Sequence, residues 1–458
     1  MNNLRAIAWN AASRVRGDTL RHLQVIRAVS RMSREDAIKD QNCRLSALIA
    51  HAYRYVPYYR KVMDGCGVVD GQGNVDLSKF HRVPFLERST LSQRNHDLRS
   101  TKPDGPPSIP NKSGGTTGMP ITFLWDESVL EWVMATKDLY DEWTGYYVGM
   151  PQVRLWGSER DVYVGGESLR TTLGRWLRNE IWLNSYKMSS KQMREYIDVI
   201  NAHRPVQILG YVGCTYELAR FAEREGCNIY SPKAVMTSAG TLHPYMRETI
   251  ERVFRAPVFN RYGTRETGDI ACECSVHDGL HICMPTHYVE IVRPDGSPAQ
   301  HGEEGEVILT LLTNYTMPLI RYRVGDTAIL KEGMCACGVS WPMLEHVTGR
   351  LTESFLLEDG GIVPAEYLNT TLYNSALNER WIKKCQCIQD DYNSVCIRIV
   401  PWDNSCSAEV THSEDLVQIR DRIQLLMGKQ CKVDFEFPED IECTQSGKYR
   451  YVISHIAR

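Results

Sequence analysis

The sequence lacks several features that would have assigned it to a class at once. No uninterrupted apolar run reaches the roughly 18–20 residues that a transmembrane helix needs. Basic residues are not in excess, since 53 Lys and Arg stand against 56 Asp and Glu and the formal net charge is −3. Internal repeats and low-complexity segments are also missing. We therefore expect no membrane span and no general electrostatic surface for nucleic acid.

The N-terminal residues and the cysteines predict the cellular compartment of the protein. Residues 1–20 contain arginines but no continuous apolar segment, which favours an amphipathic surface helix over a targeting peptide. The chain has 15 cysteines, an odd number without a secretory signal, so free thiols or a metal site are favoured over disulfides. We expect a soluble, cytoplasmic protein of more than one domain. The oligomeric state is left open, with a homodimer as one alternative.

Strand and helix patterns alternate through the middle of the chain. Short apolar strands are predicted at 153–156, 206–209 and 234–237, and helices at 192–201, 216–225 and 244–254. This rhythm is typical of a largely parallel sheet with crossover helices. After about residue 280, shorter strands at 290–292, 306–312 and 326–330 indicate a β-rich subdomain.

A distinct portion follows Gly349-Arg350. It contains predicted strands at 354–357, 385–388 and 395–400, a helix from near Pro364 and a second helix over 416–427. The predicted fold class is α/β, with mixed and parallel sheets. We assign 1–349 to a large N-terminal domain, including the β-rich subdomain at about 280–349, and 350–458 to a small α+β domain.

A stretch rich in glycine and hydroxyl groups follows a predicted turn at 108–111. Successive backbone N–H groups in such a stretch can cradle a phosphate, and the hydroxyls add donors. The residues concerned are Ser113, Gly114, Gly115, Thr116, Thr117 and Gly118. Met119 stands where a Walker A loop would have its lysine, which excludes that motif. Alone, the stretch is equally typical of a solvated turn.

Four further motifs follow in order. Residues 260–268 read NRYGTRETG and offer an aromatic face, a hydroxyl and a carboxylate suited to Mg²⁺. Residues 318–326 end in Asp326, which could accept both hydroxyls of a ribose. The last two are Gly349-Arg350 with Glu353, and Gly447-Lys448. Singly, each fits a polar turn or a salt-bridged strand end.

The order of the motifs is more specific than any one of them. SGGTTG, YGTRE, RYRVGD, GR-x-x-E and a terminal GK together resemble the adenylate-forming ligase superfamily, and most closely its phenylacetate–CoA ligase and CapK-type branch. The resemblance covers roughly residues 50–458. It implies that a carboxylate attacks the α-phosphate of ATP, pyrophosphate leaves, and the acyl-AMP is passed to an acceptor while the small domain rotates about a hinge.

The resemblance also implies roles for the matching residues. The loop 113–118 would hold the phosphates, and Lys448 would neutralise charge during adenylation. Around the adenylate, Tyr262 would stack on adenine, and Gly263 would belong to the same nucleotide site. Thr264 would contact the α-phosphate, Glu266 would ligate Mg²⁺, and Asp326 and Arg350 would hold the ribose. The catalytic set is thus Lys448, Thr264 and Glu266. Ser238, Ala239 and Gly240 occupy the adenine-side loop but depart from its usual G-A-E pattern.

Cysteine and histidine gather in two short segments, 272–281 and 335–338. Thiolate and imidazole groups on two loops suit a closed tetrahedral Zn²⁺ site, although neither segment has the usual C-x₂-C spacing. Some members of the resembled branch carry a structural zinc here. We favour Cys274, His281, Cys335 and Cys337 as ligands, with His277 or Cys272 as substitutes. Four free, partly buried cysteines are the alternative.

The substrates are the least determined feature. In the resembled fold the acyl pocket would be lined near Trp156, Tyr211 and Gly213, whose rings favour a flat acid. The expected cofactors are ATP, Mg²⁺ and structural Zn²⁺. The acceptor is CoA or, alternatively, an amine, a sugar or a carrier protein in polysaccharide or natural-product synthesis. A non-catalytic nucleotide-binding zinc protein and a redox protein are competing classes.

Overall fold

The computed structural model describes residues 17–103, 105–112, 122–156, 169–184, 188, 190–350, 355–358, 362–363, 381–401, 413–442 and 452–456. It divides into two compact units. Unit 1 comprises residues 1–242, 246–324 and 328–347, and unit 2 comprises 348–458 with the short pieces 243–245 and 325–327. The division at 349/350 stays a prediction. The predicted α/β class, with a large sheet and a separate C-terminal domain, is confirmed.

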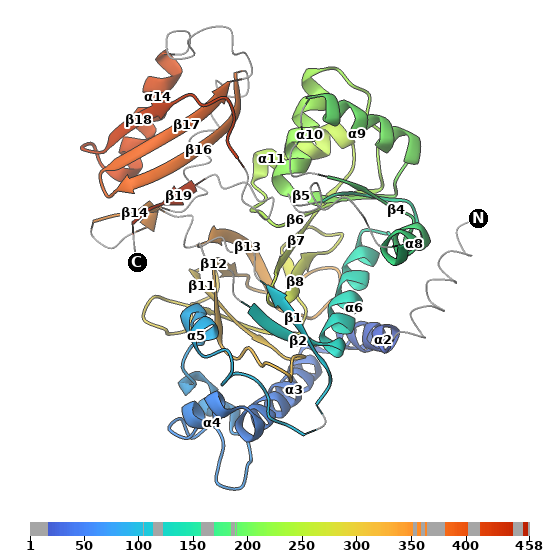
Figure 1. The fold of residues 1–458 in the computed structure, drawn as a ribbon, viewed down its shortest axis with the longest axis vertical. Helices are drawn as coiled ribbons and strands as arrows, with labels where there is room; N and C mark the ends of the chain where they lie inside the picture. Colours follow the sequence, from blue (N-terminus) through green and yellow to red (C-terminus); the bar gives the residue numbers. More distant parts are fainter. Residues whose placement is uncertain are drawn as a thin grey trace. The chain divides into compact units, whose positions relative to one another are not determined.

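An 11-stranded sheet organises unit 1, in the order β10-β11-β12-β13-β9-β8-β7-β6-β5-β3-β4 (Figure 1). Its second half is parallel, as the alternating pattern predicted. The parallel strands are β3 (Gln152–Leu155), β4 (Glu180–Leu183), β5 (Gln207–Tyr211), β6 (Ala234–Ser238) and the start of β7 (Val258–Thr264). The connecting helices are α8 (Leu169–Arg178), α9 (Ser190–His203), α10 (Val212–Arg224) and α11 (Pro244–Phe254).

The first half of the sheet is antiparallel where its pairings are described. Its strands are β8 (Gly268–Glu273), β9 (Leu280–Ile282), β10 (His287–Val292), β11 (Glu304–Leu311), β12 (Tyr322–Leu330) and β13 (Met343–Arg350). The predicted short strands of the β-rich subdomain are found, and each is longer than its sequence pattern indicated. Backbone pairing extends a strand past the point where its side chains stop alternating.

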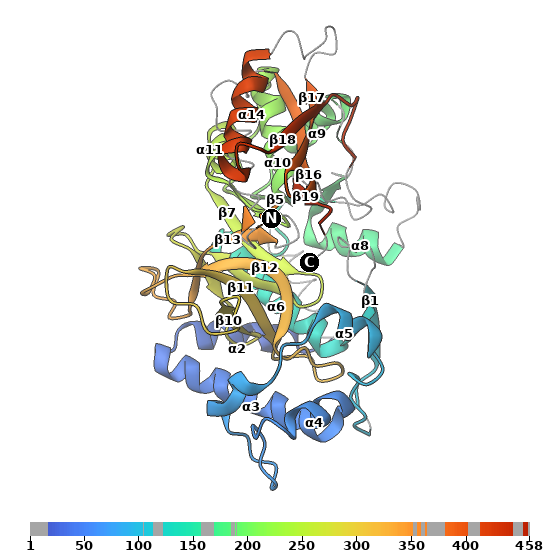
Figure 2. The ribbon, with the colours of Figure 1, turned by 90° about the vertical axis from the view of Figure 1, so that its left-hand side faces the viewer.

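The N-terminal part of unit 1 is helical. It contains α2 (Thr19–Ser30), α3 (Arg34–Tyr55), α4 (Pro57–Met63), η1 (Leu77–Arg82) and α5 (Arg88–Gln93), then the ribbon β1 (Ser108–Lys112) and β2 (Thr122–Asp126), and α6 (Glu127–Trp143). Figure 2 shows α2, α3 and α4 at one end of the unit. The predicted turn at 108–111 was wrong, because these residues pair with β2. Pro110 is tolerated there since an edge strand does not need every N–H.

Two apolar cores hold these layers together. Residues of α2 and α6, including Ile26 and Tyr140, pack with Leu209, Met236 and Phe259 of the parallel strands. A second core joins α3 and α4 to β2, β11 and β12. Burial of this apolar area is the main force that fixes α6 on the sheet.

Unit 2 contains a four-stranded sheet in the order β18-β17-β16-β19. Its elements are β14 (Phe355–Leu356), β15 (Ile362–Val363), β16 (Ile382–Asp391), β17 (Ser394–Pro401), α14 (Ser413–Met427), β18 (Lys432–Glu436) and β19 (Val452–Ser454). Buried Gln389 donates to and accepts from the backbone of Leu356, and Ser454 donates to it. This one amide joins β14, β16 and β19. The helix predicted near Pro364 lies outside the described residues.

Among the residues that the structure describes, no helix is long and apolar enough to cross a bilayer.

Tyr59 on α4 provides a test of the second core. Its buried hydroxyl donates to the carbonyl of Pro318 at 2.9 Å and accepts from the N–H of Ile320 at 3.0 Å. Tyr59→Phe leaves both backbone groups unpaired, so we expect the free energy of unfolding to fall by about 1–3 kcal/mol. Thermal unfolding measures this. Tyr53→Phe, which removes a bond to Asp64 at the surface, should cost less than about 0.5 kcal/mol; equal losses would contradict the assignment.

Candidate active site and metal centre

The carboxyl ends of the parallel strands bring several predicted residues together. Trp156 follows β3, Tyr211 ends β5 and Ser238 ends β6, with Tyr211 directly opposite Ser238 in the register. The rings of Trp156 and Tyr211 lie 4.2 Å apart between centroids. In sheets of this type, ligands bind outside the carboxyl ends of the strands. Gly213 lies in the first turn of α10, next to this edge.

A tight hairpin carries the YGTRE motif. Thr264 at the end of β7 is paired with Gly268 at the start of β8, and the Thr264 hydroxyl contacts the Thr267 hydroxyl at 2.8 Å. Gly268 has φ +81°, a value that a side chain rarely adopts. At Gly263 a Cβ would lie 2.6 Å from the carbonyl oxygen of Gly268. Both glycines are therefore required for the hairpin to close.

Two residues that sequence analysis did not select fix Glu266 within this hairpin. The indole N–H of Trp125 donates to the Glu266 carbonyl at 3.0 Å, and Arg88 on α5 lies 3.3 Å from the Glu266 carboxylate. Glu266 itself is buried. The Glu266 carboxylate, which is predicted to bind Mg²⁺, thus already has a cationic neighbour within the protein, Arg88. No motif or periodicity in the sequence pointed to Arg88 or Trp125, because both lie more than 100 positions before Glu266.

The remaining nucleotide residues are only partly described. Ala239 has φ +58°, unusual for a residue with a side chain, and exposed Gly240 follows it. Asp326 is buried on β12, and the backbone of Arg350 ends β13; both lie in segments of unit 2. The predicted phosphate loop, Ser113 to Gly118, and Lys448 lie outside the described residues.

Cys274, His281, Cys335 and Cys337 form a cluster in unit 1. Their four possible ligand atoms all lie within 4.8 Å of one another. The two sulfurs of Cys274 and Cys335 are 3.6 Å apart, and Cys337 Sγ lies 3.3 Å from His281 Nε2. A tetrahedral zinc ion with bonds of about 2.0–2.3 Å needs ligand separations of roughly 3.3–3.8 Å. The two separations of 3.6 and 3.3 Å are close to these values, so the donor set suits that ion.

The suggested substitute ligands have other neighbours. His277 Nδ1 lies 3.2 Å from Glu273, and its ring packs on Phe259 at 4.5 Å. Cys272 is fully buried in the core beneath α6. Burial lowers the pKa of His281 to about 4, so its imidazole is neutral, the form that binds metal. Burial also raises the pKa of Cys274 to about 12.

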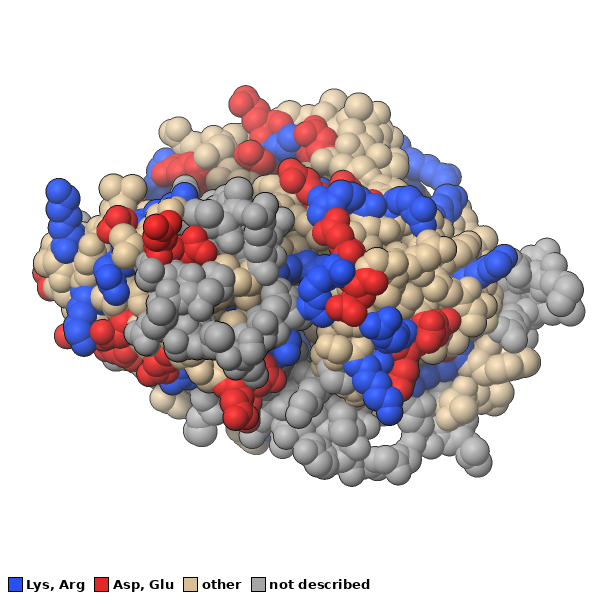
Figure 3. Space-filling model, turned by 90° about the horizontal axis from the view of Figure 1, so that it is seen from above, with Lys and Arg blue, Asp and Glu red and all other residues tan. Residues whose placement is uncertain are grey.

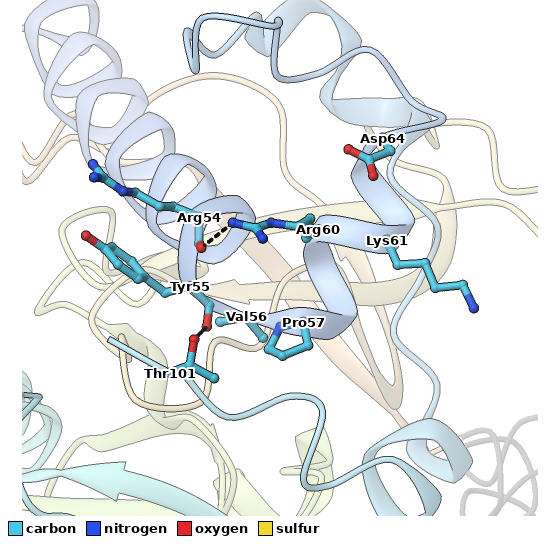
Figure 4. A pocket seen from close by; sticks show the side chains of 8 residues that line it. All are labelled: Arg54, Tyr55, Val56, Pro57, Arg60, Lys61, Asp64 and Thr101. Atoms are coloured by element: carbon cyan, nitrogen blue, oxygen red, sulfur yellow. Dashed lines mark hydrogen bonds between the residues drawn. The ribbon is translucent and has the colours of Figure 1, made fainter. Parts of the chain in front are cut away.

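Other surface features offer little chemistry. A groove of 320 Å³ at the junction of α3 and α4 is lined by Arg54, Tyr55, Arg60 and Thr101 among others (Figure 4). Arg60 donates to the carbonyls of residues 53 and 54, which occupies its guanidinium. Figure 3 shows acidic and basic side chains interspersed on the face seen from above, with no broad patch of one sign.

Comparison with known proteins places the fold and the branch. Residues 355–455 match the model of the CapK C-terminal domain. Protein CapK of Staphylococcus aureus is 24% identical over 389 residues, covering 83% of this chain and 82% of CapK. A phenylacetate–coenzyme A ligase of Aromatoleum evansii is 26% identical and covers 90% and 92%. A crystal structure of 2-hydroxyisobutyryl-CoA ligase in the postadenylation state has a TM-score of 0.73 at 18% identity, over 93% and 91%.

The chain has the fold of an adenylate-forming ligase. The relatives found by sequence indicate a narrower group than the structural neighbours do, because they include four phenylacetate–CoA ligases and CapK. The comparisons confirm the resemblance to the CapK and phenylacetate–CoA ligase branch of that superfamily that was drawn from the motifs.

The hairpin can be tested at Gly263. Gly263→Ala would place a methyl group 2.6 Å from a backbone oxygen that cannot rotate away, so we expect a loss of about 1–3 kcal/mol of stability and weakened ATP binding. Calorimetry of unfolding and of ATP binding measures both. Gly71→Ala is the matched control, because a methyl group there meets nothing within 4 Å. Unchanged ATP binding in Gly263→Ala would show that the hairpin does not shape the nucleotide site.

Proposed function

We propose that this protein is an ATP-dependent ligase that converts a carboxylic acid into an acyl-AMP, releases pyrophosphate, and then transfers the acyl group to CoA. The observation that carries the proposal is the YGTRE hairpin, with its Thr264 hydroxyl and Glu266 carboxylate next to the ligand-binding edge of the parallel strands. It occurs in a chain whose relatives include enzymes named as phenylacetate–CoA ligases.

The first step forms a bond between a carboxylate oxygen and the α-phosphorus of ATP while the bond to the pyrophosphate oxygen breaks. Positioning and electrostatic stabilisation dominate such a transfer because charge spreads over the phosphoryl oxygens. The Thr264 hydroxyl, free to exchange its contact with Thr267, would donate to an α-phosphate oxygen. Glu266 is the residue that would hold Mg²⁺, which supplies positive charge to the phosphates. Lys448 and the loop 113–118 keep the roles implied by the family.

The acyl group and the acceptor follow from weaker signals. Trp156 and Tyr211, whose rings are tilted by 36° to each other, offer flat apolar surface at the strand ends, which suits a planar part of the acid. The relatives named as CoA ligases support CoA as the acceptor rather than an amine, a sugar or a carrier protein.

Carboxylate-dependent exchange between ATP and labelled pyrophosphate tests the adenylation step without CoA. We expect exchange with some members of a panel of aryl, aliphatic and amino acids. Lys448→Ala should lower it by about 10²–10³-fold, the usual effect of removing one charge-stabilising group, while ATP binding is largely kept.

Lys39→Ala is the control for that experiment, since Lys39 is exposed on α3 and pairs with Glu35; its exchange should equal that of the wild type. Folded protein that binds ATP but exchanges with no acid would favour the non-catalytic nucleotide-binding alternative. Exchange that survives unchanged in Lys448→Ala would remove the assigned role of that lysine.

We also infer that Cys274, His281, Cys335 and Cys337 hold a structural zinc ion. Three thiols and one imidazole at the observed separations supply four ligands and leave no open coordination position for a substrate. His281 lies on β9, opposite Met343 of β13, so the ion would fasten the segments that flank this pair of strands. Its role would be stability rather than catalysis.

Elemental analysis of the purified protein tests this inference. We expect about one equivalent of zinc, and in Cys335→Ser a loss of the metal with a melting temperature lower by several degrees, because metal binding is coupled to folding. Cys43→Ser, at an exposed cysteine on α3, should change neither. Less than about a tenth of an equivalent, together with a normally folded Cys335→Ser variant, would overturn the zinc assignment.

A further inference from the structure

Two contacts from distant parts of unit 1 hold Glu266 at the turn of the YGTRE hairpin. The indole N–H of Trp125 on β2 donates to the Glu266 backbone carbonyl at 3.0 Å, and Arg88 Nη1 donates to the carboxylate oxygen Oε1 at 3.3 Å. The side chain of Glu266 is only 8% exposed. With so little exposure, the orientation of the carboxylate is set by its partners in the protein rather than by water.

Arg88 is itself held in place by strand β12. Leu86, two residues earlier, is completely buried and forms a parallel bridge with Tyr322. Its N–H donates to the carbonyl of Arg321 at 2.8 Å, and its carbonyl accepts from the N–H of Arg323 at 3.1 Å. Helix α5 then begins at Arg88. The guanidinium therefore extends toward the hairpin from a backbone that is fixed on both sides.

The ion pair uses only one of the two carboxylate oxygens. Arg88 contacts Oε1 of Glu266, and in the part of the chain that the structure describes Oε2 has no hydrogen-bond partner. An ionised carboxylate has lone pairs on both oxygens. A carboxylate that is held at one oxygen therefore keeps the other for a second partner.

A divalent cation suits that second partner. Mg²⁺ in nucleotide sites is usually bound by one or two carboxylates, and phosphate oxygens and water complete its shell. Among the described residues, the only set of three or more grouped candidate metal ligands is the cysteine and histidine cluster, and Glu266 does not belong to it. The orientation of Glu266 is therefore decisive for the metal, because no such set of acids surrounds it to take its place.

We propose that Arg88 is a positioning residue for the metal that accompanies ATP: its bond to Oε1 fixes the Glu266 carboxylate and leaves Oε2 in one orientation for the metal. This rests on the proposed function, in which Glu266 ligates Mg²⁺. Hydrogen-bond partners of a metal ligand orient it, and their loss typically weakens metal binding by about ten- to a hundredfold. Arg88 does not bind the metal, since both are cations, and acts only through Glu266.

Metal binding without turnover tests the inference. The probe is Mn²⁺, which takes the same oxygen ligands as Mg²⁺ and is detected through water-proton relaxation. In the full-length protein with ATP and no acid, Arg88→Met should weaken Mn²⁺ binding by about ten- to a hundredfold. Arg88→Lys keeps a charged donor and should retain part of the affinity. ATP binding in EDTA, measured by calorimetry, should be largely kept in both variants, because no metal takes part in it.

A double substitution shows whether Arg88 acts through Glu266. Glu266→Gln should itself weaken Mn²⁺ binding in the ATP complex. Adding Arg88→Met to Glu266→Gln should then cause little further loss, because the ligand that Arg88 orients is already gone. Losses that simply add would overturn the inference.

Controls separate the possible failures. Arg99→Met is the matched control, since Arg99 is exposed and its guanidinium donates to the side chain of Asn95; its Mn²⁺ binding should equal that of the wild type. Melting curves report whether each variant is folded, and Arg88→Lys carries the test if Arg88→Met does not fold.

Two results would overturn the positioning role while the ligase function stands. One is Mn²⁺ binding that is unchanged or tighter in Arg88→Met. The other is a loss of ATP binding in EDTA as large as the loss of Mn²⁺ binding, which would show that Arg88 acts on the nucleotide. A wild type that binds ATP but recruits no Mn²⁺ to the complex would overturn the metal role of Glu266 and this inference together.

Discussion

Strand β7 changes partners along its length, and the rest of unit 1 depends on that change. Its first residues pair in parallel with β6, at Met236 opposite Phe259, and its last residues pair antiparallel with β8, at Thr264 opposite Gly268. One continuous backbone ladder thus joins a parallel half to an antiparallel half, and in sheets with such a parallel half the strand ends are where ligands usually bind. The YGTRE hairpin lies at the end of this strand. Its threonine and glutamate are held on rigid structure rather than on a free loop.

Polar groups in unit 1 are buried in two different ways. Some, such as Tyr59 with the backbone of residues 318 and 320, are fully paired and serve stability. Others, such as the ion pair of Arg261 with Asp269, are enclosed but leave atoms of both side chains without a hydrogen bond. Buried polar atoms of this kind cost stability.

The cysteine and histidine cluster lies next to the antiparallel strands β8, β9 and β13. Cys274 follows β8 and His281 lies on β9, while Cys335 and Cys337 precede β13, which pairs with β9. These segments include tight turns and little apolar surface of their own, with only Cys274, Cys335 and Met343 forming a small core. A metal ion can replace a missing core in such a place, since its binding free energy adds to folding.

By itself, the sequence determined the order of motifs, the alternating pattern of the parallel half and the cysteine–histidine segments. These are local properties: a glycine needed for a positive φ, or apolar residues at a strand's period, are visible in a few neighbouring positions. The boundaries were less well predicted, and the turn expected at 108–111 is a strand, because pairing with β2 decides its conformation. Only the tertiary structure placed Arg88 beside Glu266 and Asp141 beside Gln207. Those neighbours come from packing of α5 and α6 on distant strands, and no sequence period records which side chains then face each other.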